Sequence, residues 1–113
     1  MALSDAELVR MAQGGDATSL GILLERHRTP LHALALQMLG HAPQAQDAVQ
    51  DAFLIALRNI DRLRQPEAVG GWLRVILRNV CLERLRHREV RSSSMSLLGA
   101  SSRSLTSPRL RKL

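Results

Sequence analysis

The stretch DAVQDAF, residues 47–53, sets polar and apolar side chains on separate faces of one helix. Val49 and Phe53 are four residues apart and belong to an apolar stripe that we expect to be buried. Its members are Ala45, Val49, Ala52, Phe53, Ala56, Leu57 and Ile60. Positions i, i+3 and i+4 of a helix share a face, and here they carry two carboxylates and an amide: Asp47, Gln50 and Asp51. The stretch therefore predicts an amphipathic helix, over about residues 43–61, with an acidic outer face.

Helical periodicity continues on both sides of this stretch, and no segment shows sustained alternation of period two. Ser4 and Glu7 form a capping box ahead of a short helix over about 5–13, and Asp16 can cap a second helix that ends before Gly40. Pro30 lies within that second helix and is expected to kink or interrupt it. After a connector over 61–71, a fourth helix runs from about 71 to 88.

The sequence therefore predicts an all-α fold, with a compact three-helix core and a short N-terminal helix. The apolar stripe of the third helix is expected to pack against Trp72, Ile76 and Val80 of the fourth. Residues 1–91 form the expected domain. Residues 92–113 are rich in Ser and Arg and are expected to form a flexible basic tail.

The charge of the chain is divided along its length. Residues 1–61 hold four Arg against seven carboxylates, a net charge of −3, whereas residues 62–113 hold eleven Arg and one Lys against three carboxylates, a net charge of +9. Such asymmetry favours an acidic half that meets a protein and a basic half that meets phosphates. Many of the basic residues lie on or beside the fourth helix, where they can contact a nucleic acid.

Each of these surfaces has a simpler explanation. The acidic side chains of the third helix could be a solvated face that keeps the helix soluble, and composition alone favours this. The Arg-rich end of the fourth helix could likewise be solvated and could interact favourably with the helix dipole. The sequence also contains neither a Gly-rich phosphate loop nor a nucleophile beside the carboxylates, so catalysis is not expected.

Three segments in order resemble region 2 of bacterial RNA polymerase sigma factors of the extracytoplasmic-function (ECF) subfamily. Residues 3–16 are similar to the opening of the family, residues 45–53 to the helix that grips the polymerase clamp, and residues 71–86 to the helix that faces the promoter −10 element. The resemblance covers residues 3–91. It implies a sigma factor region 2 type of fold, without enzymatic activity.

The resemblance also implies roles for individual residues. Asp47, Gln50 and Asp51 would contact the clamp coiled coil of the β′ subunit of core RNA polymerase. The connector would lie where the family captures a flipped base. The residues that would contact promoter DNA are Arg62, Arg64, Arg74, Arg78, Asn79, Arg84, Arg86 and Arg88.

Two features depart from the family. Phe53 and Trp72 are the only aromatic residues, so the connector cannot stack a base on a ring and must rely on backbone, Arg62, Arg64 and Gln65. Residues 92–113 also contain no helix-turn-helix that would serve as region 4. Two alternatives therefore stay open: an interaction protein that occupies the clamp or binds an anti-sigma factor without starting transcription, and a DNA-binding helical protein unrelated to polymerase.

The remaining expectations are absences. No apolar run approaches the roughly 20 residues that span a bilayer, and the N-terminus lacks a secretory signal pattern, so a cytoplasmic location is expected. The single cysteine, Cys81, lies in an apolar helical pattern and has no partner thiol. The histidines have no ligand-type spacing, so neither a metal nor another cofactor is expected.

Overall fold

The computed structural model describes the backbone of residues 2–96 and the side chains of residues 2–90. The order of elements is α1 (Asp5–Gln13), α2 (Ala17–Leu39), α3 (Ala42–Asn59), two short 3₁₀ turns, η1 (Ile60–Arg62) and η2 (Pro66–Ala68), and α4 (Val69–Ser96). The described residues contain no strand, which confirms the all-α prediction. Residues 97–113 of the predicted tail lie outside the described part.

The helix ends follow from local capping chemistry. The Ser4 side chain accepts from the Glu7 amide while Glu7 accepts from the Ser4 amide, so the predicted capping box is present. Asp16 caps α2 by accepting from the Ser19 amide at 3.2 Å. The second helix ends at Gly40, whose φ of 81° lies in the left-handed region that glycine adopts readily.

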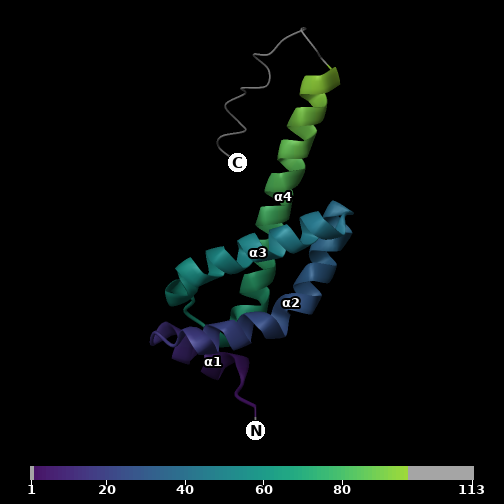
Figure 1. The fold of residues 1–113 in the computed structure, drawn as a ribbon. Helices are drawn as coiled ribbons and strands as arrows, with labels where there is room; N and C mark the ends of the chain where they lie inside the picture. Colours follow the sequence, from purple (N-terminus) through teal and green to yellow (C-terminus); the bar gives the residue numbers. More distant parts are fainter. Residues whose placement is uncertain (1, 97–113) are drawn as a thin grey trace. The chain divides into compact units, whose positions relative to one another are not determined.

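α2 continues through Pro30, and Figure 1 shows that the helix bends partway along its length. Proline removes one intrahelical hydrogen bond, here to the carbonyl of Arg26, and crowds the preceding turn, which is the usual cause of such a bend. Of the two outcomes that the sequence left open, the structure has the kink.

Small side chains form much of the contact between α3 and its neighbours. α1 and α3 both pack against α2, and the four alanines of the buried α3 face are fully covered: Ala45, Ala48, Ala52 and Ala56. Val49 and Phe53 are buried as predicted, but Leu57 is 52% exposed, so its assignment to the core was wrong. Alanines let helix backbones approach closely, and the larger leucine is left outside that contact.

α4 begins at Val69, two residues before the predicted start, and reaches Ser96. Its buried stripe is Val69, Leu73, Leu77 and Cys81. The predicted stripe of Trp72, Ile76 and Val80 was one position out of register, because these three side chains are only half-buried. The chain divides into two compact units, the first ending at Cys81 and the second beginning at Leu82, so α4 contributes to both. The predicted boundary at residue 91 stays a prediction.

Candidate protein- and nucleic-acid-binding surfaces

The acidic face predicted on α3 consists of Asp47, Gln50 and Asp51. Asp47 and Gln50 are exposed, and Asp51 is half-buried. All three lie on the first half of α3, opposite the alanines that pack inward, and a rigid helix fixes their spacing. Two carboxylates on a fixed frame can accept paired hydrogen bonds from guanidinium groups of a partner.

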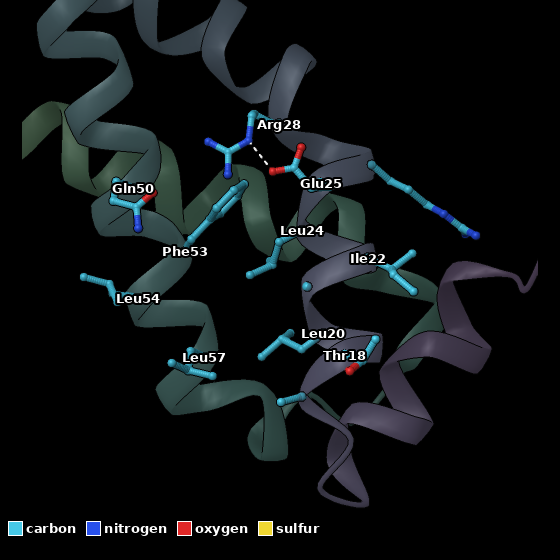
Figure 2. Close-up of a pocket in the computed structure, with 13 residues that line it drawn as sticks. Thr18, Leu20, Ile22, Leu24, Glu25, Arg28, Gln50, Phe53, Leu54 and Leu57 are labelled. Carbon is cyan, nitrogen blue, oxygen red and sulfur yellow. Dashed lines mark hydrogen bonds and ion pairs between the residues drawn. The ribbon is translucent and has the colours of Figure 1, made fainter.

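A groove of about 960 Å³ runs between α2 and α3 beside this acidic face. Figure 2 shows Leu20 and Leu24 of α2 on the side that faces Phe53 and Leu57 of α3, with Gln50 farther along α3. Leu54 also lines the groove. The groove is open to solvent, and its walls are largely aliphatic. A long apolar groove with polar groups beside it suits the apolar face of an amphipathic helix.

One end of the α2–α3 groove is ordered by charged groups. The Arg28 guanidinium lies 4.9 Å from the centroid of the Phe53 ring, and its Nε donates to Glu25 Oε2 at 2.7 Å (Figure 2). A guanidinium over an aromatic face is a favourable cation–π arrangement. These contacts hold the Phe53 ring between the core and the groove.

Sequence reasoning missed the apolar half of this surface. Leu54 is 42% exposed and Leu57 52% exposed, and they continue the α3 surface one and two turns beyond Gln50. Exposed leucines that cluster beside a polar set are typical of a protein-binding surface. The available signal was the run of alanines at steps of three and four, which competes with the leucines for the inward face.

The position of α1 against α2 depends on a buried apolar contact and on one polar cluster. Leu8 and Val9 are fully buried. Asp5 Oδ2 lies 2.7 Å from His27 Nε2, and Asp5 Oδ1 accepts from Arg26 at 3.1 Å. Burial opposes the charged form of Asp5, but the hydrogen bonds and charges of His27 and Arg26 outweigh it and hold the pKa of Asp5 below its ordinary value.

Five of the residues predicted to meet DNA lie in the first unit, in two places. Arg62 and Arg64 are exposed in the connector between α3 and α4. Arg74, Arg78 and Asn79 are exposed on α4, where 74 and 78 are one turn apart on the same face.

The Arg74 guanidinium lies beside the two glycines that open α4. Its nitrogens are 3.9 and 3.7 Å from the positions that a Cβ would take at Gly70 and Gly71. Both distances are in the range of ordinary van der Waals contact, so the guanidinium lies directly against this part of α4. The start of α4 is therefore a surface on which backbone and a cation lie close together.

The second unit holds the other three predicted DNA contacts. Arg84, Arg86 and Arg88 are half-buried, and Arg86 donates to the Glu83 carboxylate. Glu83 Oε2 also lies 3.0 Å from His87 Nε2. The hydrogen bonds from Arg86 and His87 lower the pKa of Glu83. Part of the positive charge on this segment is therefore balanced within the helix.

Two kinds of feature are absent from the described residues. No cluster of three or more His, Cys, Asp or Glu side chains in that part of the chain could hold a metal ion. None of its helices combines the length and apolar character needed to cross a membrane.

This geometry agrees with what comparison to known proteins finds. The family model for sigma-70 region 2 matches residues 23–91, a span that contains the α3 acidic face, the α3 wall of the α2–α3 groove, the connector and the described basic residues of α4. The chain belongs to the sigma-70 region 2 family. No solved structure matches it significantly.

Several curated relatives are ECF RNA polymerase sigma factors. The chain is 42% identical over 83 residues to SigM of Mycobacterium tuberculosis, which covers 74% of this chain and 42% of that protein. It is 40% identical over 68 residues to EcfG of Rhodopseudomonas palustris, which covers 58% of this chain and 38% of that protein. It is 26% identical over 81 residues to SigW of Bacillus subtilis, which covers 72% of this chain and 43% of that protein. The chain thus spans about two fifths of the length of these relatives.

Proposed function

We propose that this chain acts as region 2 of an ECF sigma factor, which binds core RNA polymerase and engages the promoter −10 element without covalent chemistry of its own. Its membership of the sigma-70 region 2 family carries the proposal. The relatives named as ECF RNA polymerase sigma factors support it, because their similarity extends over most of this chain.

Polymerase binding is assigned to the α3 acidic face together with the α2–α3 groove. The partner would be the clamp coiled coil of the β′ subunit, a pair of helices that can present guanidinium groups to Asp47 and Asp51. The exposed Leu54 and Leu57 give the same partner an apolar contact. Aliphatic burial would supply most of the affinity and the charges would set orientation and association rate, so the two parts of the surface have separate roles. An anti-sigma factor would compete for this surface.

Promoter binding is assigned to the connector and to the exposed cations of α4 in the first unit. Arg74 and Arg78 can contact phosphates, and the amide of Asn79 can contact a base edge. The connector has no aromatic residue, so a base held there would contact backbone, Arg62 and Arg64 rather than a ring. The contacts of Arg84, Arg86 and Arg88 remain a prediction for the second unit.

The decisive experiment adds core RNA polymerase and a library of single-stranded oligonucleotides with a randomised window. With both the chain and polymerase present, we expect recovery of a shared short motif, and polymerase alone should recover none. The motif placed at −10 of a linear template should then support run-off transcription. Polymerase binding without any enriched motif would favour the interaction-protein alternative. Enrichment without polymerase binding would favour the unrelated DNA-binding protein.

A further inference from the structure

The side chain of Gln13, the last residue of α1, reaches across to the connector between α3 and α4. Its Nε2 donates to the main-chain carbonyl of Ile60 at 2.9 Å and to that of Leu63 at 2.8 Å. Both hydrogen bonds are part-buried. One amide group therefore holds the first residue of η1 and the residue that follows η1, which lie 47 and 50 positions later in the sequence.

The connector has few hydrogen bonds of its own. Its turns are closed by the Leu63 amide donating to Ile60 at 3.2 Å, the Ala68 amide donating to Gln65 at 2.8 Å and the Val69 amide donating to Pro66. Carbonyls at the end of a helix have no intrahelical partner and need another donor. Gln13 supplies a donor to the Leu63 carbonyl and a second donor to the Ile60 carbonyl, which also accepts from the Leu63 amide. α1 contacts both η1 and η2, but the other polar contact, Arg10 to Glu67 at 3.2 Å, is exposed and contributes little.

The segment that Gln13 holds carries the exposed side chains of Arg62, Arg64 and Gln65. We propose that Gln13 is a positioning residue, which fixes the connector backbone in the conformation that receives the promoter strand. This inference rests on the proposed function. A connector without aromatic rings must present a pocket made largely of backbone, and a preformed backbone avoids the ordering cost of binding. α1 lies outside the span matched by the family model.

The test compares Gln13→Met with Gln37→Met in the full chain. Methionine keeps the length and helix propensity of glutamine but removes both donors, and Gln37 is an exposed glutamine of α2. In Gln13→Met, the amides of residues 61–68 should exchange with solvent roughly tenfold faster, since two hydrogen bonds are lost. Amides of α2 and α3 should keep their rates. With core polymerase, the affinity for the selected single strand should fall severalfold while polymerase affinity is unchanged.

A third variant tests the chemistry of the contact. Gln13→Glu carries a carboxylate that cannot donate when ionised and regains one O–H donor when protonated. At neutral pH its connector should exchange as fast as that of Gln13→Met, and the two variants should diverge as the pH falls, with Gln13→Glu moving toward the wild type. A simple packing role for the side chain would give no such divergence.

Several outcomes would overturn the positioning role. Uniformly faster exchange throughout the first unit would assign Gln13 to general stability, and unchanged exchange would show that it does not hold the connector. A looser connector with undiminished strand binding would separate the contact from DNA engagement. If the wild-type complex with polymerase selects no strand, the proposed function fails and the positioning role fails with it, whereas the exchange rates still report whether Gln13 holds the connector.

Discussion

Replacing Phe53 with alanine tests whether the α3 side of the core has been identified correctly. The Phe53 side chain is 6% exposed, and its ring lies 4.9 Å from the Arg28 guanidinium. Part of the ring borders the α2–α3 groove, so solvent can fill some of the space that the substitution creates. This places the expected loss at the lower end of the usual range for a buried phenylalanine.

The magnitude follows from three contributions. Truncating a buried Phe to Ala costs roughly 3–5 kcal/mol, and the groove favours a value near 3. Loss of the cation–π contact with Arg28 adds about 0.5–1 kcal/mol. A domain of this size has a free energy of unfolding of roughly 4–12 kcal/mol, taken from about 0.05–0.15 kcal/mol per residue, so Phe53→Ala should remove a large fraction of the stability.

Urea denaturation of the full chain, followed by far-ultraviolet circular dichroism, measures the loss. With an m-value of roughly 1–3 kcal/mol/M, the midpoint should fall by about 1–4 M. Leu57→Ala is the matched control, because Leu57 lies one turn later on the same helix and is 52% exposed; its cost should stay within about 0.5 kcal/mol. A loss below about 1 kcal/mol for Phe53→Ala, or equal losses for both variants, would refute the placement of this residue in the core.

Three further predictions concern the first unit. Because the pKa of Asp5 is lowered in the folded state, its ion pairs stabilise the fold at pH values above the unfolded-state pKa of about 4. This stability is lost as the pH falls below about 4 and through the folded-state pKa. In Asp5→Asn, the urea midpoint should therefore decline less steeply below about pH 4. Gly40→Ala should destabilise the fold by roughly 1 kcal/mol because the φ of Gly40 is 81°. Gly21 lies within α2 and has open space around it, so Gly21→Ala should stabilise the fold by roughly 0.4–1 kcal/mol. Thermal melts that shift in the same direction for both variants would contradict this. Removing Arg74 and Arg78 together should weaken single-strand binding and reduce the slope of log K against log salt by roughly 0.7 per lost phosphate contact; a titration series with an unchanged slope would exclude these two as contacts.

Local chemistry made most of the helix boundaries predictable. The capping box at Ser4, the Asp16 cap and the Gly40 terminus are each determined by residues within one turn, and α1 and α2 end where the sequence indicates. The connector was also expected from Pro66, but the paired glycines that were assigned to it lie in the first turn of α4, which extends to Ser96. Short-range rules therefore account for the order of the helices and for the ends of α1 and α2.

Packing depends on which faces meet, and there the sequence was less informative. Leucine is more hydrophobic than alanine, so hydrophobicity alone placed Leu57 inward, whereas the close contact around α3 requires the smaller side chains of Ala52 and Ala56. The register of α4 was also misjudged, because neighbouring residues there are both apolar and hydrophobicity does not say which faces inward. Of Trp72 and Leu73, only Leu73 is fully covered.

The candidate site was likewise predictable from the sequence only in part. The acidic set on α3 could be recognised from its spacing of three and four residues, which any helix would preserve. The apolar groove could not, because it is formed by residues of two helices whose relative position is a tertiary property. The hydrogen bonds of Gln13 to the connector likewise join residues that no local pattern relates.

The central claim is that the α3 acidic face binds core RNA polymerase, and the affinity of one double variant tests it most directly. Asp47→Arg with Asp51→Arg should lower the affinity for core polymerase by roughly a hundredfold or more, since like charges would then face each other across the interface. Asp61→Arg with Glu89→Arg makes the same change in net charge at other exposed positions and should bind as the wild type does. Circular dichroism should show both variants to be helical. Equal affinity of the two double variants for core polymerase would contradict the account.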